Sequence, residues 1–277
     1  MKFLFCGDVM GQSGRKAVAQ YVPQLRQKYA LDAVIINGEN AAHGLGLTPK
    51  TYKDLIRAGA DIITMGNHTF DKMDIVKIWA DENVLVRPLN YPSDTVGKGY
   101  QIVEVAGQRL CVVQVLGRAF MNSKLELADP FQTMQTFIEE HGSEYDILVV
   151  DYHAETTAEK VVMGYFLDGK AVLVVGTHTH IPTNDAHILP NGTAYLTDVG
   201  MCGDYTSVIG MTRETAFSHF GLGTERMRFE PATESSTLCA ILVETDGVRP
   251  FLASLSFWVI PLKIPIQYDI IRKNERI

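Results

Sequence analysis

The chain has 277 residues, of which 46% are hydrophobic and 21% are charged, with 25 Lys and Arg against 32 Asp and Glu. This composition is typical of a folded globular protein and excludes global disorder. The net charge of −7 disfavours bulk binding of nucleic acid, because such binding needs an extended basic surface. It does not exclude a small nucleotide held at a local cationic site.

The first third of the chain repeats one pattern three times. Short apolar runs over 2–6, 33–36 and 61–65 each end in a polar turn that contains glycine. Helical patterns follow over 15–29, over 49–58 with Thr48 as N-cap and Pro49 at the first helical position, and over 71–80. This order of strand, turn and helix predicts parallel strands in an α/β fold.

The rest of the chain is richer in strands. We expect strands over 84–86, 99–105, 109–116, 147–152, 171–175, 194–197, 237–244 and 250–259, and a helix over 130–141. The second and third of these strands form a hairpin around Gly107 and Gln108. No linker divides the chain, so we expect one domain over 1–262 and a peripheral or disordered tail over 263–277.

The cysteines and the apolar runs indicate in which cellular compartment the protein is expected. The four cysteines form no CxxC pair, which favours reduced core residues of a cytosolic protein. The first apolar run ends at Asp8, too early for a signal peptide, and the run over 250–262 is too short to cross a bilayer. We therefore expect a cytoplasmic protein without a membrane partner. The stretch with Phe257 and Trp258 is either core or an interface, so a homo-oligomer stays open.

Polar side chains stand at the ends of five predicted strands. They are Asp8, Glu39, Asn40, Asn67, His68, His153, His178 and His180. Ligands bind α/β sheets beyond the carboxyl ends of the strands, so we expect these side chains to converge. A mixture of carboxylate, amide and imidazole ligands suits Fe, Mn or Zn better than Mg or Ca. His178 and His180 are a candidate chelating pair if they lie on a strand, because residues i and i+2 face the same side.

Each of these residues also has a simpler interpretation. An Asp or Asn after a strand is commonly a turn or cap residue, and an isolated histidine is commonly hydrogen-bonded. Their joint placement favours a metal site. The remaining histidines are interpreted as surface residues; they are His43, His141, His187 and His219. The sequence contains neither a P-loop nor a nucleophile elbow.

Together these motifs resemble those of the calcineurin-like metallophosphoesterases. NGEN at 37–40, GNHTFD at 66–71, DYHAE at 151–155, GTHTHIPT at 176–183 and TDVGMCG at 197–203 resemble more narrowly the bacterial YmdB-like branch. The wider family begins with Asp-x-His, whereas Asp8 is followed here by Val9 and Met10. The resemblance implies that Asn40 takes the place of that histidine. It also implies a metallophosphoesterase-like β-sandwich of two mixed sheets flanked by helices, with the active site at the carboxyl ends of the strands.

The resemblance further implies two metal ions, Fe or Mn, with Zn as a third option. One ion would bind Asp8, Glu39, Asn40 and His180, the other Glu39, Asn67, His153 and His178, and Glu39 would bridge them. A metal-bound hydroxide would attack phosphorus, with His68 as the general acid. Asp71 would orient His68, or cap a helix, and Glu155 would support a ligand, or start an exposed helix.

The YmdB-like branch is associated with cyclic nucleotide phosphodiesterases, so the resemblance implies a 2′,3′-cyclic nucleotide as substrate, with 3′,5′-cyclic AMP as a second option. Two alternatives stay open. One is a phosphomonoesterase or 5′-nucleotidase on the same core, for which Arg15, Lys16 and Arg118 lie near predicted turns. The other is a metal-binding regulatory scaffold without significant catalysis.

Overall fold

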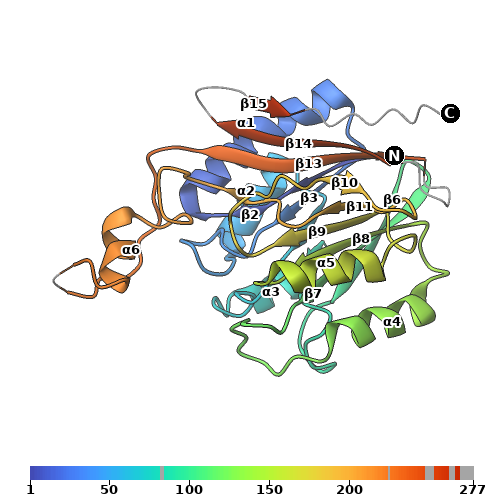
Figure 1. Ribbon diagram of the computed structural model, residues 1–277, viewed down its shortest axis with the longest axis horizontal. Coiled ribbons are helices and arrows are strands. Elements are labelled where there is room, and N and C mark those ends of the chain that lie inside the picture. The colour runs from blue at the N-terminus through green and yellow to red at the C-terminus, as the bar shows by residue number, and fades with distance from the viewer. Residues whose placement is uncertain (82–83, 224, 247–252, 262–265, 269–277) are drawn as a thin grey trace.

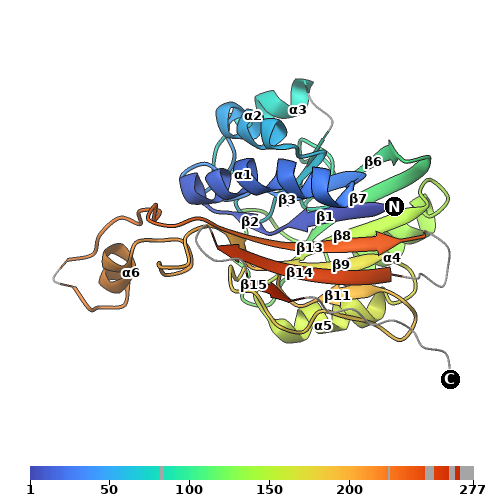
Figure 2. The same cartoon turned by 90° about the horizontal axis from the view of Figure 1, so that it is seen from above.

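Two β-sheets stacked face to face form the body of the protein, with helices on both outer sides (Figures 1 and 2). The computed structural model describes residues 1–81, 84–223, 225–246, 253–261 and 266–268. The helices are α1 (Gly11–Tyr29), α2 (Pro49–Ala58), α3 (Ile75–Asp81), α4 (Pro130–His141), α5 (Thr157–Phe166) and α6 (Arg213–His219). Within these ranges, no helix is both long and apolar enough to cross a membrane.

The first sheet has the strand order β15-β14-β13-β1-β3-β4-β5. Its strands are β1 (Lys2–Cys6), β3 (Ala33–Asn37), β4 (Ile62–Thr64), β5 (Leu85–Val86), β13 (Thr237–Thr245), β14 (Ala253–Pro261) and β15 (Ile266–Tyr268). The strands β1, β3, β4 and β5 run parallel, as the repeated pattern predicts, whereas β13, β14 and β15 pair antiparallel. The sheet is therefore mixed.

The second sheet has the strand order β10-β11-β9-β8-β7-β6. Its strands are β6 (Tyr100–Val105), β7 (Gln108–Leu116), β8 (Ile147–His153), β9 (Leu173–Thr177), β10 (His187–Ile188) and β11 (Ala194–Leu196). The four strands β7, β8, β9 and β11 are parallel, with an antiparallel partner at each edge. A short parallel pair, β2 (Asp8–Val9) with β12 (Met201–Cys202), forms a separate two-stranded sheet beside the first one.

Alternate residues of each central strand pack on opposite sides of the sheet. Phe3 and Phe5 of β1 join the core between the two sheets, whereas Leu4 and Cys6 pack in the core shared with α1 and α2. A third core lies between the outer face of the second sheet and α4 and α5. Strands buried on both faces need apolar side chains at every position, which is why they appear as unbroken apolar runs.

Several element boundaries differ from the expected ones. The helices α2 and α4 match at both ends, but α3 begins at Ile75 because residues 66–74 form turns. The hairpin turn is at Ala106 and Gly107, both with positive φ, one residue earlier than expected. The helices α5 and α6 were not predicted, and α6 extends away from the sheets (Figures 1 and 2).

The expected tail over 263–277 is described only at β15, which pairs with β14. The rest of that tail, and the side chains of Phe257 and Trp258, lie outside the described residues. All four cysteines are buried and free, as expected.

Candidate metal centre and active site

The polar residues predicted to converge come from the strand ends of both sheets. Asp8 lies in β2, Glu39 and Asn40 follow β3, Asn67 and His68 follow β4, His153 ends β8, and His178 and His180 follow β9. The turn after β4 lies so close to Glu39 that only glycine fits at position 66. A Cβ atom there would lie 2.2 Å from Glu39 Oε2.

A chain of hydrogen bonds fixes the orientation of the His153 ring. Thr177 Oγ1 donates its one hydrogen to Asp151 Oδ1 over 2.6 Å, so it can only accept from His153 Nδ1, 2.8 Å away. Burial raises the pKa of Asp151 to about 6, so this carboxyl group is mainly ionised at neutral pH. The other ring atom, His153 Nε2, therefore faces the candidate metal centre.

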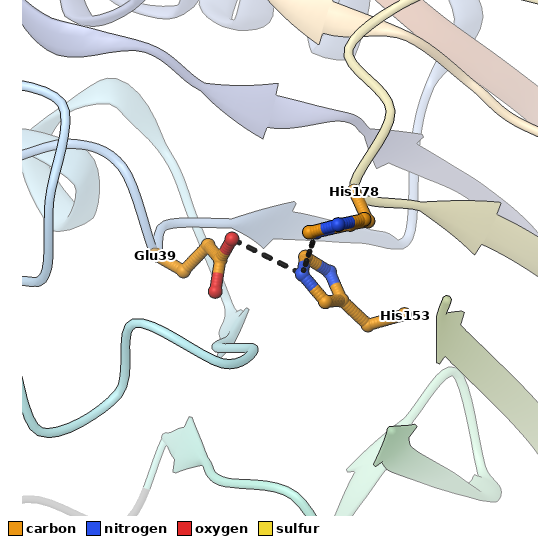
Figure 3. Close-up of side chains that lie close together, drawn as sticks. All are labelled: Glu39, His153 and His178. Carbon is orange, nitrogen blue, oxygen red and sulfur yellow. Dashed lines mark hydrogen bonds and ion pairs between the residues drawn. The ribbon is translucent and has the colours of Figure 1, made fainter. Parts of the chain in front are cut away.

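Three electron-pair donors surround His153 Nε2. Asn67 Oδ1 lies 2.9 Å from it, Glu39 Oε1 3.1 Å and His178 Nδ1 3.1 Å. Figure 3 shows the side chains of Glu39, His153 and His178 pointing toward one another. Their ligand atoms all lie within 4.8 Å of one another. Such a cluster of oxygen and nitrogen atoms fits a cation.

The pKa values of His153 and Glu39 also indicate that positive charge stabilises this cluster. Burial alone lowers the pKa of His153, but Glu39, Asp8 and Asp151 raise it to about 9. Burial alone raises the pKa of Glu39, but His153 and His68 lower it well below its usual range. A proton on His153 thus stabilises the carboxylates, and a bound metal ion would replace that proton.

A second group of ligand atoms lies around His180. Its Nδ1 donates to the carbonyl oxygen of Ile209 over 2.8 Å, which leaves Nε2 facing Asn40 Oδ1 at 3.2 Å. The Asn40 amide donates to the carbonyl oxygen of Gly44, so its oxygen is the atom turned toward His180. The buried Asp8 Oδ1 has no hydrogen-bond partner within the described residues. These groups also fit a cation.

The interpretation of His178 and His180 as neighbours on one strand is wrong. The strand β9 ends at Thr177, and both histidines have positive φ, 97° and 66°. This backbone turns the two rings apart, so that His178 points to His153 and His180 points to Asn40. They belong to two different groups of ligand atoms.

The His68 side chain is held beside the candidate metal centre. Its backbone N–H donates to Glu39 Oε2 over 3.0 Å, and its Nδ1 lies 2.7 Å from Asp71 Oδ2. Lys124 Nζ lies 2.5 Å from the other oxygen of Asp71. The expected contact of Asp71 with His68 is thus present. The alternative, in which Asp71 caps a helix, is wrong because α3 begins only at Ile75.

Glu155 contacts a predicted ligand and does not start a helix. Its Oε2 lies 3.0 Å from His178 Nε2, and Thr156 caps α5 instead. Sequence patterns missed several supporting residues: Lys124, Asp151, Thr177 and Asp198. Asp151, Thr177 and Asp198 lie within quoted motifs, and this was the one signal in the sequence that could have indicated them. Lys124 lies in a segment without a pattern.

Comparison with known proteins identifies the family. Residues 4–251 match the YmdB-like protein family. The chain belongs to the YmdB-like family. It is 47% identical over 246 residues to the 2′,3′-cyclic-nucleotide 2′-phosphodiesterase of Bacillus subtilis, an alignment that covers 89% of this chain and 92% of that protein. It is 38% identical over 250 residues to a putative phosphatase/phosphodiesterase of Mycoplasma genitalium, covering 88% and 87% of the two chains.

Solved structures agree with this placement of the YmdB-like chain. A novel phosphatase from Mycoplasma pneumoniae superposes with a TM-score of 0.85 at 36% identity, covering 94% of this chain and 93% of that one. The 5′-nucleotidase precursor of Thermus thermophilus, with a TM-score of 0.60 at 12% identity, covers 96% of this chain and 56% of that one and shares the fold alone. The expected metallophosphoesterase-like fold is confirmed, and the chain is an enzyme of the phosphoesterase class.

Proposed function

We propose that the protein hydrolyses 2′,3′-cyclic nucleotides to nucleoside 3′-phosphates, with 3′,5′-cyclic AMP as a second substrate. The observation that carries the proposal is the convergence of ligand atoms around His153 Nε2 and His180 Nε2, with His68 beside them. The name of the Bacillus subtilis relative, at 47% identity, supports this choice of substrate.

The ligand atoms would hold two metal ions, Fe or Mn, with Zn as a third option. One set of ligands is Asp8, Glu39, Asn40 and His180, and the other is Glu39, Asn67, His153 and His178. When bound, the ions would lower the pKa of a water molecule and neutralise charge on the phosphate. Glu39 suits the shared position because both of its oxygens point into the site, one toward His153 and one toward the backbone of His68.

His68 would act on the leaving oxygen. Asp71 holds Nδ1, which leaves Nε2 as the ring atom for the substrate. In the proposed step a water molecule gives one proton to solvent and its oxygen bonds to phosphorus, the bond between phosphorus and O2′ breaks, and the proton of His68 passes to O2′. His68 then takes a proton back from solvent. The product then keeps its phosphate on the 3′ oxygen.

Two further features of the chain belong to this proposal. We place the enzyme in the cytoplasm, supported by four buried, free cysteines, which suit a reducing compartment. We also propose that residues 1–262 act as one domain, supported by a site whose ligands come from both sheets.

The test is hydrolysis of 2′,3′-cyclic AMP by Mn-loaded protein, with the product isomer identified by chromatography. His68→Ala should lower kcat by about 10²–10⁴-fold, the usual contribution of a general acid, and should keep its metal content. His219→Ala, on α6, is the matched control. Turnover of His68→Ala equal to that of the wild type would contradict the assigned role.

The monoesterase alternative is less well supported. Of the three cations on which this alternative relies, Arg15 contacts Asp54 and a backbone carbonyl and Arg118 contacts Asp129, so these two already have acidic partners, which leaves Lys16. Accumulation of 3′-AMP without release of inorganic phosphate would support the diesterase. Release of phosphate from 3′-AMP would favour the monoesterase, and inactivity of the metal-loaded protein on all esters would favour the scaffold.

A further inference from the structure

The segment after β7 is joined to the candidate active site at two points. Its first residue, Gly117, donates its N–H to the carbonyl oxygen of His153 over 3.0 Å. Seven residues later, Lys124 Nζ lies 2.5 Å from Asp71 Oδ1, and the other oxygen of Asp71 holds His68. Both ends of this stretch therefore contact residues of the site, which keeps the residues between them within four positions of such a contact.

Phe120 stands between these two contacts with its ring in solvent. Its side chain is 88% exposed, more than any other large apolar side chain in the described part of the protein. Its φ is 59°, a left-handed backbone that is uncommon for a bulky residue other than glycine. Strained positions of this kind tend to cluster at active sites and ligand clamps.

We infer that Phe120 is the platform on which the base of the nucleotide stacks, an inference that rests on the proposed function. A nucleobase has two apolar faces, and an exposed aromatic ring offers the matching flat surface. Phe120 has no ring partner among the described residues, so its face is free for a ligand.

The surroundings of Phe120 suit a nucleotide as well. Arg118 and Lys124 lie on the same segment, but each is paired with a carboxylate, Asp129 and Asp71, so this segment is suited to bind the base and not the phosphate. Met73 lies two residues after Asp71, is 67% exposed and adds apolar surface to the segment that Lys124 contacts. A base would thus lie on apolar atoms while its phosphate faces the ligand cluster.

The experiment compares 2′,3′-cyclic AMP with methyl riboside 2,3-cyclic phosphate, which has the same ester and no base. Phe120→Ala should lower kcat/KM for the nucleotide by about tenfold or more, mainly through KM, because stacking on an aromatic ring contributes that much per base. It should leave kcat/KM for the base-free ester unchanged. Phe120→Tyr should behave like the wild type, since it keeps the ring.

Phe220→Ala is the matched control, because Phe220 follows α6 and is 80% exposed. Equal losses of Phe120→Ala on both substrates would overturn the inference and assign the residue to loop structure. An unchanged kcat/KM for the nucleotide would overturn it too. If the wild type opens neither ester, the proposed function itself fails, and the inference falls with it; opening of both esters at equal efficiency rejects the inference alone.

Discussion

Glu39 connects the parts of the site that come from the two sheets. It follows β3 of the first sheet, and its Oε1 lies 3.1 Å from Nε2 of His153 in the second sheet. Its Oε2 accepts the backbone N–H of His68 over 3.0 Å. The side chain is buried, so its charge is weakly screened, and we expect a neutral replacement to have a large effect on metal binding.

Glu39→Gln tests this connection at the level of one residue. The amide keeps the shape but removes the charge and one acceptor, so metal binding should weaken by at least about 100-fold, beyond the usual effect of a residue that supports a ligand. Elemental analysis after desalting measures it. Glu139→Gln, exposed on α4, should keep its metal. Full metal content in Glu39→Gln would exclude Glu39 as a ligand.

Most residues of the site were predicted from the sequence because they stand directly after apolar runs. The residues that form hydrogen bonds and ion pairs with them were not predicted. Lys124 contacts Asp71 from 53 positions further along the chain, and Asp198 contacts Thr179 from 19 positions away. Such partners carry no periodic signal, since they depend on where two loops meet in space.

Among the elements, the loop after β9 depends on one buried ion pair. The Nζ atom of Lys160, in α5, lies 2.6 Å from Asp198 Oδ2, and both side chains are 1% exposed. The same oxygen accepts the backbone N–H of Thr179 at 3.2 Å and its hydroxyl at 2.8 Å. Asp198 thereby holds the residue between His178 and His180, whose left-handed backbones need such support.

Lys160→Met tests the contribution of this pair. Removing one partner leaves a buried, uncompensated carboxylate, which typically costs about 3–5 kcal/mol of the free energy of unfolding. Urea unfolding followed by circular dichroism gives the value. Lys77→Met is the control, because the Lys77–Asp74 pair is exposed. Loss of an exposed pair should leave the free energy of unfolding nearly unchanged. Equal effects of the two variants would refute a special role for Lys160.

The boundary of α3 also shows how the site shapes an element. The pattern predicted a helix from residue 71, but the turns over 66–74 have the bonds Thr69 N–H to Gly66 O and Asp71 N–H to His68 O instead. These turns bring Asp71 beside His68. The local helical preference gives way here to contacts made by the folded protein.

At the scale of the whole molecule, the site exists only when the two sheets are packed together. Asp8, Glu39 and Asn67 come from the first sheet and the adjoining pair β2–β12, whereas His153 and His178 come from the second. The apolar core between the sheets, with Phe3 and Phe5 on one side and Val112 and Val149 on the other, sets their separation. We therefore expect the binding of metal ions at this site to be coupled to the stability of the sandwich.

Removal of metal should lower the thermal stability of the whole protein. A ligand that binds only the folded state at 100 times its Kd adds about 2.7 kcal/mol, so Tm should fall by roughly 5–10 °C after chelation. Differential scanning calorimetry before and after chelator, and after return of Mn²⁺, measures this shift. The Glu39→Gln variant should show little response. An unchanged Tm of demetallated wild type would contradict the coupling.

The sequence by itself determined the parallel strands, most helices and the polar residues at the strand ends, because the periodicity of a strand or a helix is a local property of the chain. It also carried the motifs from which the family was recognised. Only the tertiary structure decided how the left-handed backbone turns the rings of His178 and His180 apart, that Lys124 contacts Asp71, and that Phe120 stands in solvent. These features depend on side-chain directions and on contacts between distant segments, which arise when the two sheets pack.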